Sequence, residues 1–326
     1  MKMKFLFSLF VGTLLLVSPA EAGQEAATLF GRIREASFGV LVDGRLNGSG
    51  WFVAGHGLAV TTAHTVGQRN QIEILTADRG RLPARVIARD LRHDLCLLRV
   101  EPREGFFTSL ELVNAPPASG AELFLTGSPL FRHDLMVPGR IARSDFQYEW
   151  NAPNQCYTRA IPVAAVVAPG FSGGPWTNGM GQVVGIQSGV MEQQGIPMGL
   201  AFASPAAAVK NLLAEKRDQP APTVGTVLAE AWEPPLPKDK TRQSGLTVIQ
   251  LTADSSLARA GVKVGDSILA LNGREVSYRD DFLSGIEAAG VGARVRLLVE
   301  DRAGETRMVE VEVGTCRIPL RSGRKG

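Results

Sequence analysis

Cysteine, histidine and tyrosine are scarce in this chain, and their scarcity excludes several kinds of protein. The 326 residues include three cysteines, four histidines and three tyrosines. The sequence contains no C-x-x-C pair and no cluster of cysteine and histidine, so we expect no metal site. An odd number of cysteines leaves at least one thiol free, and the spacing leaves open whether Cys156 pairs with Cys316.

A strong charge of either sign is also missing. The 35 basic and 32 acidic residues give a formal net charge of +3, and no dense basic run precedes the short tail at 321–325. We therefore expect no nucleic-acid partner. The content of 44% apolar and 21% charged residues is typical of a packed globular protein, and the length suffices for about two domains.

Long hydrophobic runs are absent, and the N-terminal pattern is that of a targeting signal. Two lysines precede a mostly apolar run of 13 residues, 5–17, which is shorter than the roughly 20 residues that span a bilayer. The Ala-Glu-Ala run at 20–22 then fits a small-x-small cleavage site. We expect residues 1–22 to be a cleaved signal peptide, Gly23 to begin the mature chain, and the protein to be periplasmic or secreted.

Residues 25–210 contain short apolar runs separated by glycine, proline and polar clusters, a cadence typical of an all-β barrel or sandwich. Helical spacing of alanine, valine and leucine first occurs at 205–216, where we expect a helix that closes this domain. The predicted strands are 39–42, 50–53, 58–62, 71–75, 85–87, 95–100, 123–126, 163–167, 183–186 and 199–203.

The polar, proline-containing stretch 217–221 predicts a linker, after which the pattern changes. Residues 222–314 predict a small α+β domain, and residues 315–326 form a basic tail. The whole chain should therefore be mainly β. The predicted elements of the second domain are strands at 246–251, 267–271, 294–300 and 306–313 and helices at 255–260 and 278–289.

Residues 169–175, Pro-Gly-Phe-Ser-Gly-Gly-Pro, carry the first sign of chemistry. Glycines on both sides of Ser172 add nothing to a core, but they allow a tight turn whose N–H groups point at one place. A serine nucleophile needs that arrangement, together with a base and a partner that orients the base. His64 and Asp94, each beside an apolar strand, supply the missing residue types. Their order, His then Asp then Ser, is the order found in chymotrypsin.

Each of these residues has a rival or a plainer explanation. A serine among glycines is often only a loop, and a single histidine near a strand end is more often structural than catalytic. His93 is the one serious rival of His64, and it should face away from the contacts of Asp94 because neighbouring side chains of a strand point to opposite faces. Asp90 is the rival of Asp94, but we expect it in a polar loop.

Together the motifs resemble those of the HtrA/Deg family of serine proteases, in which a trypsin-like domain precedes a PDZ domain. The resemblance implies two six-stranded antiparallel barrels over 23–216, with the triad His64, Asp94 and Ser172 between them, and a PDZ domain over 222–314. It covers essentially the whole mature chain. The stretches that carry it are 48–52, 62–66, 93–98, 127–129, 137–141, 169–175, 181–186, 199–203, 255–262 and 264–273.

The resemblance also implies acyl transfer without a cofactor. Gly170, Phe171 and Ser172 would form the oxyanion hole, and Phe171, where the family usually has a small polar residue, would change the rim of the specificity pocket. Val166, six residues before the serine, would lie at the base of that pocket, so we expect cleavage after small or medium aliphatic residues. The walls of the pocket would come from Gln187, Ser188 and Gly189.

In the second domain, the resemblance implies that peptide C-termini bind as an added strand, with the carboxylate held by backbone N–H groups. The matching loop has Thr226 where the family usually has an apolar residue. It consists of Val224, Gly225, Thr226 and Val227.

The sequence therefore predicts an exported, ATP-independent serine endopeptidase that acts on unfolded or damaged envelope proteins. The resemblance further implies a homotrimer. One alternative is a chaperone or peptide-sensing scaffold with little or no proteolysis, although such a protein has no need for all three triad residues. Another is a regulatory protease with a single substrate.

Overall fold

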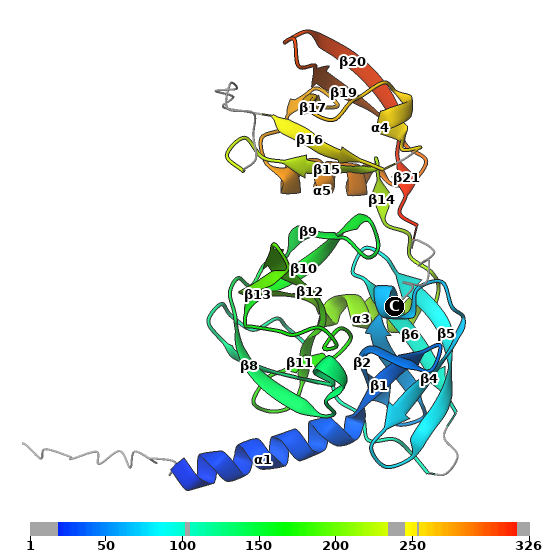
Figure 1. The fold of residues 1–326 in the computed structure, drawn as a ribbon, viewed down its shortest axis with the longest axis vertical. Coiled ribbons are helices and arrows are strands. Elements are labelled where there is room, and N and C mark those ends of the chain that lie inside the picture. Colours follow the sequence, from blue (N-terminus) through cyan, green and yellow to red (C-terminus); the bar gives the residue numbers. More distant parts are fainter. Residues whose placement is uncertain (1–18, 102–104, 234–244, 253, 318–326) are drawn as a thin grey trace, which may run out of the picture.

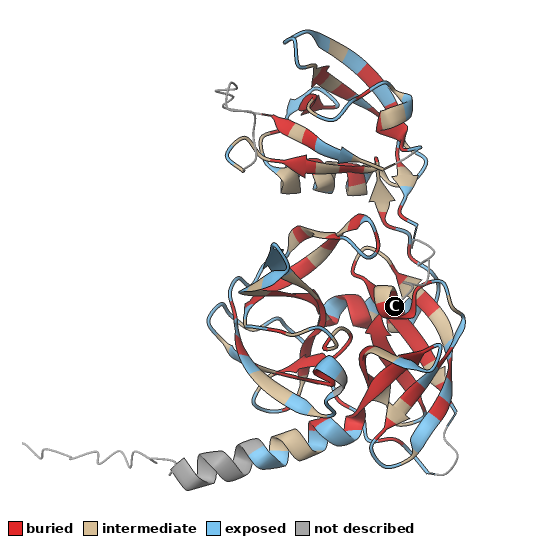
Figure 2. Ribbon diagram, viewed as in Figure 1, coloured by how far each residue is buried: buried red, intermediate tan, exposed pale blue. Residues whose placement is uncertain are grey.

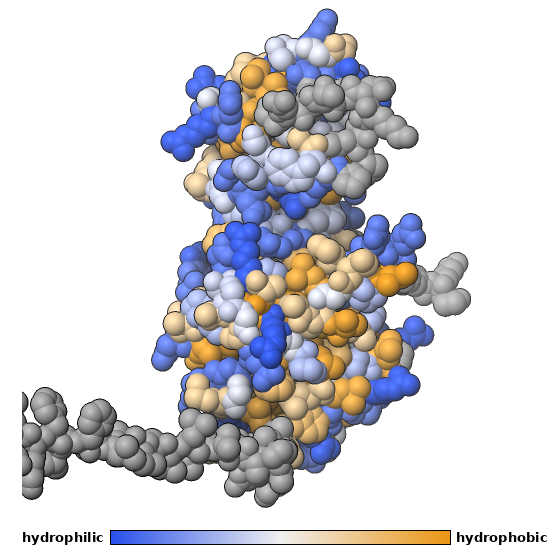
Figure 3. Space-filling model, turned by 90° about the vertical axis from the view of Figure 1, so that its left-hand side faces the viewer, coloured by the Kyte–Doolittle hydropathy of each residue, from blue (hydrophilic) through white to orange (hydrophobic). Residues whose placement is uncertain are grey.

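The chain folds into two units that lie one above the other in Figure 1. The computed structural model describes residues 19–101, 105–233, 245–252 and 254–317. The larger unit is almost entirely β, as the cadence of short apolar runs predicted, and the smaller unit mixes strands with two helices. On the face shown in Figure 3, the narrow junction between the units is largely hydrophilic.

The first part of the larger unit is a closed barrel of six strands in the order β1-β2-β3-β6-β5-β4. Its interior is filled by apolar side chains from every strand, among them Phe38, Phe52 and Leu98. In Figure 2, β1, β3 and β6 are almost entirely buried, while exposed and buried residues alternate along much of β4 and β5. The strands are β1 (Ser37–Val42), β2 (Arg45–Ala54), β3 (Leu58–Thr62), β4 (Gln71–Thr76), β5 (Gly80–Asp90) and β6 (Leu95–Val100).

The second part is a seven-stranded sheet in the order β13-β12-β11-β7-β8-β10-β9, in which β13 also pairs with β10. That extra pairing closes six strands into a ring and leaves β9 outside it. The two barrels that the sequence predicted are thus confirmed. The strands are β7 (Glu122–Gly127), β8 (Leu135–Ile141), β9 (Gln147–Asn151), β10 (Cys156–Ala164), β11 (Pro175–Thr177), β12 (Val183–Gln193) and β13 (Ile196–Pro205).

Three helices accompany the barrels. The expected closing helix is present as α3 (Ala206–Glu215), which packs Val209 and Leu212 into the core. Helix α1 (Pro19–Ala36) contains the proposed cleavage point after residue 22, while residues 1–18 of the proposed signal lie outside the described part. The four-residue α2 (Ala63–Val66) follows β3 directly. Across the described ranges, none of the helices combines the length and apolar character needed to cross a membrane.

The smaller unit is a sheet in the order β15-β16-β17-β19-β20 around one apolar core that includes Phe282 and Leu297. The predicted helices and strands of this unit are all present. The structure adds four short strands that the sequence did not predict: β14 (Pro222–Thr223), β15 (Thr226–Ala229), β18 (Arg274–Glu275) and β21 (Gly314–Thr315). The predicted elements are β16 (Leu246–Leu251), α4 (Ser256–Arg259), β17 (Ser267–Leu271), α5 (Arg279–Ala289), β19 (Arg294–Glu300) and β20 (Thr306–Glu312). Most of the basic tail lies outside the described residues.

The predicted linker 217–221 is bound to the first barrel rather than being a loose tether. The N–H group of Gln219 donates to Arg89, and its carbonyl accepts from Leu91. The carboxylate of Asp218 accepts from the Arg89 N–H group. Both Gln219 and Ala221 are buried. These contacts fix the path of the chain into the second unit.

The hairpin β9–β10 of the larger unit carries most of the side-chain contacts to the smaller one. The Tyr157 hydroxyl donates to the Leu228 carbonyl and accepts from the Leu228 N–H group. Arg159 forms an ion pair of 3.2 Å with Glu287 on α5, and Tyr148 hydrogen-bonds the same carboxylate. This hairpin therefore supplies polar contacts that join the two units.

Glu149, on β9, is a carboxylate placed at this junction. Burial raises its pKa to about 7, and the nearby Asp280 and Glu233 add to the increase, while Arg279 and a hydrogen bond from Gln147 oppose it. An unfolded glutamate has a pKa of 4.5. Between about pH 4.5 and 7, Glu149 is therefore mostly protonated in the folded chain and mostly ionised in the unfolded chain. The stability of the junction should therefore fall as pH rises through this window.

We predict that Glu149→Gln is more stable, relative to the parent chain, at pH 8 than at pH 5. The neutral amide avoids the buried charge that the carboxylate carries at pH 8, whereas the parent carboxyl group is already protonated at pH 5. Thermal unfolding of both chains at the two pH values measures this difference. The same difference in midpoint at pH 5 and pH 8 would show that Glu149 titrates as an ordinary glutamate.

Candidate active site

Asp94 lies in the turn between β5 and β6, with a backbone φ of +54° and no exposed surface. The same turn brings its two sequence rivals together. The ring of His93 contacts the carboxylate of Asp90 at 2.7 Å, and both side chains are buried. We expected Asp90 to lie in a polar loop, and this was wrong: it is the last residue of β5 and is fully buried. His93 and Asp90 therefore pair with each other, and Asp94 pairs with His64.

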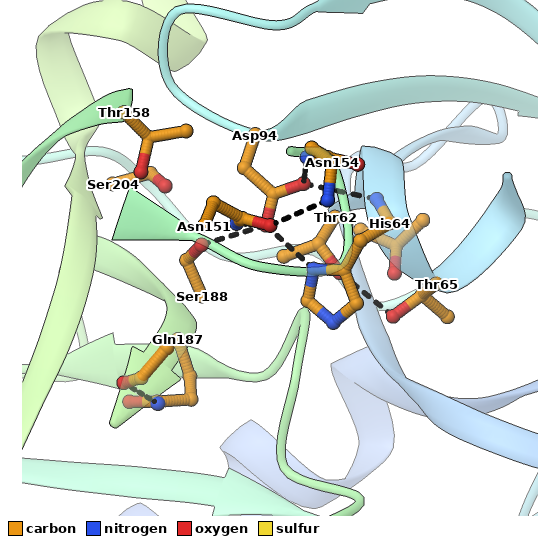
Figure 4. A network of polar contacts seen from close by, with 12 residues as sticks. Thr62, His64, Thr65, Asp94, Asn151, Asn154, Thr158, Gln187, Ser188 and Ser204 are labelled. Carbon is orange, nitrogen blue, oxygen red and sulfur yellow. Dashed lines mark hydrogen bonds and ion pairs between the residues drawn. The ribbon is translucent and has the colours of Figure 1, made fainter. Parts of the chain in front are cut away.

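His64 sits in α2 rather than at a strand end, since the chain turns into this helix directly after β3. Its Nδ1 atom lies 2.6 Å from Asp94 Oδ2, and its backbone N–H group donates to Asp94 Oδ1 at 2.9 Å. Two contacts to one carboxylate fix both the position of the helix and the orientation of the ring. Figure 4 shows the imidazole turned toward this carboxylate.

Three further side chains donate to the Asp94 carboxylate, as Figure 4 shows. Asn154 donates to Oδ1 at 2.7 Å, while Asn151 and Ser188 donate to Oδ2 at 3.1 and 2.6 Å. Burial alone would raise the pKa of Asp94, but the charge of His64 and the hydrogen bonds from His64 and Ser188 outweigh it. The result is a pKa below the usual value, so the carboxylate stays ionised in its buried position.

The serine loop is held between the two barrels by its backbone. The Ser49 N–H group donates to the Ser172 carbonyl at 2.7 Å, and the Gly173 N–H group donates to the Gln187 carbonyl at 2.7 Å. Gly173 has a φ of +90°, and a Cβ atom there would lie 2.0 Å from the Ser49 carbonyl oxygen. Only glycine fits this position, because both the torsion angle and the close approach exclude a side chain.

The N–H groups of Gly170, Phe171 and Ser172 donate to no partner within the described part of the chain. The Pro169 carbonyl, which precedes them, accepts from Leu130 and therefore points away from the loop. Unpaired backbone N–H groups beside a serine form a site for an oxygen that gains negative charge. These are the residues that the sequence predicts for the oxyanion hole.

His64 and Ser172 line one cleft of about 300 Å³. In the described part of the chain, the side chains of His64 and Ser172 form no hydrogen bond with each other. In serine hydrolases without substrate this contact is often long, and it shortens when substrate binds. The other residues around the cleft are mainly apolar or small. They are Trp150, Asn151, Ala152, Pro153, Val167, Ala168, Pro169, Gln187, Ser188, Gly189, Val190 and Glu192.

The structure places some predicted pocket residues elsewhere. The side chain of Val166 is 72% exposed and does not line the cleft, whereas the next residue, Val167, is buried and does. The ring of Phe171 packs in the core of the second barrel rather than at the pocket rim. The Gln187 side chain accepts from the Trp176 indole, and Ser188 donates to Asp94, so both support the site as well as lining the cleft.

The predicted peptide site of the second unit lies beside a cavity that Gln155 of the larger unit also lines. Val224 and Gly225 line a cavity of about 450 Å³, together with Arg259. The hydroxyl of Thr226 is turned inward to the Gln250 carbonyl. β15 is the edge strand of its sheet, the kind of edge to which a peptide strand can be added, and Tyr157 contacts it there at Leu228.

Sequence reasoning missed Asn151 and Asn154. Their run, Asn-Ala-Pro-Asn, predicts a turn, and the hairpin does turn there, but the sequence gives no sign that both amides reach an aspartate 57 and 60 residues away. Among the described residues, no three His, Cys, Asp or Glu side chains are placed to bind a metal ion.

Both units of the chain match known protein families. Residues 48–186 match the family model described as a trypsin-like peptidase domain, and residues 226–313 match that of a PDZ domain. The chain therefore has the two domains that its sequence motifs indicated.

The similar curated proteins are probable periplasmic serine endoproteases described as DegP-like. The protein from Pseudomonas fulva is 30% identical over 278 residues, covering 82% of this chain and 56% of the relative. That from Pseudomonas fluorescens is 31% identical over 280 residues, with 82% and 56% covered. The resemblance to the HtrA/Deg proteases is confirmed, although the chain spans only about half the length of these relatives.

Solved structures show the same fold. The HtrA-type protease AlgW with a decapeptide superposes with a TM-score of 0.60 at 20% identity, covering 90% of this chain and 99% of the other. A serine endoprotease from Yersinia pestis gives a TM-score of 0.56 at 19% identity, covering 88% and 97%.

We predict that Gly173→Ala lowers the free energy of unfolding by about 2–4 kcal/mol, because it combines an unfavourable torsion angle with a clash against the Ser49 carbonyl. Gly195→Ala is the matched control: its φ is +78°, but nothing lies within 4 Å of the added atom, so the loss should be about 1 kcal/mol. Denaturant unfolding measures both. Equal losses would mean that the serine loop is not packed as tightly as described.

Proposed function

We propose that this chain, a trypsin-like peptidase domain followed by a PDZ domain, is a serine endopeptidase. The observation that carries the proposal is the buried pair of Asp94 and His64 in the cleft that Ser172 also lines. A carboxylate that is fully buried and still ionised, and that holds one nitrogen of an imidazole, leaves the other nitrogen to act as a base. The serine and the unpaired N–H groups complete the requirements of acyl transfer.

In the proposed reaction, Ser172 Oγ attacks the scissile carbonyl carbon while His64 Nε2 takes the hydroxyl proton. Asp94 fixes the tautomer of His64 and stabilises the imidazolium ion. The N–H groups of Gly170 and Ser172 bind the oxygen that becomes negative. His64 then gives its proton to the leaving amine, and a water molecule repeats the sequence to release the acid. The chain's own groups supply every proton transfer.

The proposed substrates are unfolded or damaged proteins of the cell envelope, cut after small or medium aliphatic residues. Support comes from the apolar side chains of Val167 and Val190 in the cleft and from the absence of an acid among its buried lining residues. Glu192, the one carboxylate at this cleft, is exposed at its edge. The same proposal includes export by a cleaved signal peptide and assembly as a homotrimer. Export is supported by the description of the relatives as periplasmic.

We also propose that the PDZ domain binds the C-terminal ends of peptides at β15, with the carboxylate near Val224 and Gly225. Both N–H and C=O groups of Leu228 are bonded to the Tyr157 hydroxyl. An added peptide strand needs such groups for its own hydrogen bonds. Peptide binding at this position therefore competes with the contact that the hairpin makes.

The first test is digestion of a reduced, unfolded model protein by the chain beside Ser172→Ala and Asp94→Asn. We expect cleavage by the parent chain, none by the serine variant, and a loss of about 10⁴-fold in kcat for the aspartate variant because His64 loses its orienting partner. Sequencing of the products should place most cuts after Ala, Val and residues of similar size. Cleavage that persists in Ser172→Ala would reject the mechanism, and cuts mainly after Lys or Arg would reject the substrate preference.

A second prediction concerns Tyr157→Phe, which removes the hydroxyl that binds Leu228 but keeps the ring. Peptides with an apolar C-terminus should bind about 3–10-fold more tightly, the gain expected when roughly one hydrogen bond no longer has to be broken. Fluorescence anisotropy of a labelled peptide measures the affinity. Tyr148→Phe is the control, because its hydroxyl contacts Glu287 on α5 and not the β15 edge. Equal affinities for all three chains would exclude competition at Leu228.

A further inference from the structure

Two of the three cysteines meet at the boundary between the domains. Cys156 is the first residue of β10 in the peptidase domain, and Cys316 directly follows β21 at the end of the PDZ domain. Both are buried, and they pack together with Ala221 of the connecting segment. The Cys316 N–H group donates to the Ala221 carbonyl at 2.9 Å. The backbone thus holds the second cysteine in place against the first.

The two cysteines share one small buried cluster. The neighbouring Cys316 thiol, with burial as a second cause, raises the pKa of Cys156 well above its usual value. Cys96 differs, because it belongs to the core of the first barrel. Two buried cysteines can serve simply as small hydrophobic residues. Here, however, they come from the two domains and share a cluster at the boundary, which is the placement that a crosslink between the domains requires.

We propose that Cys156 and Cys316 form a redox-sensitive disulfide that fastens the PDZ domain to the β9–β10 hairpin. The ring so closed contains 159 residues between the two positions, which is large for a crosslink and removes much conformational freedom from the unfolded chain. In the structure both residues are free cysteines.

The oxidant is another disulfide, such as oxidised glutathione, which reacts by exchange. One cysteine thiolate attacks the oxidant and releases one of its sulfurs as a thiol, and the second cysteine then displaces the other sulfur. The protein loses two protons and two electrons, and the oxidant gains them. Because the thiols are buried and that of Cys156 has a raised pKa, exchange should occur while the chain folds or while the domains are apart, and slowly in the closed form.

The crosslink would bear on the candidate active site through the hairpin turn. Asn154 lies two residues before Cys156, and its amide donates to Asp94 at 2.7 Å. A covalent bond at the base of the turn restricts the movement that would withdraw this amide. The catalytic consequence rests on the proposed function, whereas the crosslink itself does not, and the test below is independent of proteolysis.

The test is to refold the chain with oxidised glutathione, alkylate it after denaturation without reducing it, and map the tryptic peptides by mass spectrometry. We expect one alkylated cysteine, Cys96, and peptides 144–159 and 308–317 joined with a mass about 2 Da below their sum. After reduction, all three cysteines should be alkylated. Alkylation of all three without reduction, or a bond that involves Cys96 or a second chain, would overturn the proposal.

Variants separate the crosslink from general effects of the reductant. Cys96→Ser should keep the joined peptides, while Cys156→Ser and Cys316→Ser should lose them. Reduction should lower the unfolding midpoint of the parent chain and of Cys96→Ser by roughly 5–15 °C and leave the other two variants unchanged. If the joined peptides are found but reduction leaves the unfolding midpoint of the parent chain unchanged, the claim that the disulfide fastens the domains is wrong. Failure of proteolysis in all variants would reject only the proposed function.

Discussion

The buried carboxylate of Asp94 is the constraint on which the site depends. An ionised group without exposed surface is unstable unless hydrogen bonds replace the lost water, and this one accepts five. His64 of the first barrel supplies two of them, and Asn151, Asn154 and Ser188 of the second barrel supply three. The carboxylate is therefore satisfied only when both barrels are formed and closed against each other, which places the cleft at their boundary.

The β9–β10 hairpin joins this constraint to the second domain. Its turn gives Asn151 and Asn154 to the carboxylate, while its strands give Tyr157 and Arg159 to the PDZ domain. A hairpin is a stiff two-stranded unit, so movement at one end changes the geometry at the other. The contacts at the junction are polar and include a carboxyl group of raised pKa, which makes the docking of the domains sensitive to conditions. The hairpin thus contacts both the carboxylate that orients His64 and the strand that carries the proposed peptide site.

The sequence predicted the parts of this site that are encoded locally. The glycines around Ser172 and the strands beside His64 and Asp94 form recognisable patterns because a tight turn or a buried strand limits which residues fit. The contacts of Asn151 and Asn154 escaped prediction because they join segments far apart in the chain. β8, β9 and β11 were missed for a related reason: β11 is only three residues long, and Pro138 interrupts β8. The exposure of Val166 shows that a spacing taken from a resemblance does not fix which neighbouring side chain faces a pocket.

Reaction with an organophosphonate tests the central claim directly, because such a reagent labels a serine only where a base and an oxyanion hole activate it. It requires no knowledge of the natural substrate. The account predicts a single covalent adduct on Ser172, formed slowly or not at all in His64→Ala and Asp94→Asn. No adduct on Ser172 in the parent chain, or labelling at the same rate in His64→Ala, would contradict the assignment of these three residues as one catalytic unit.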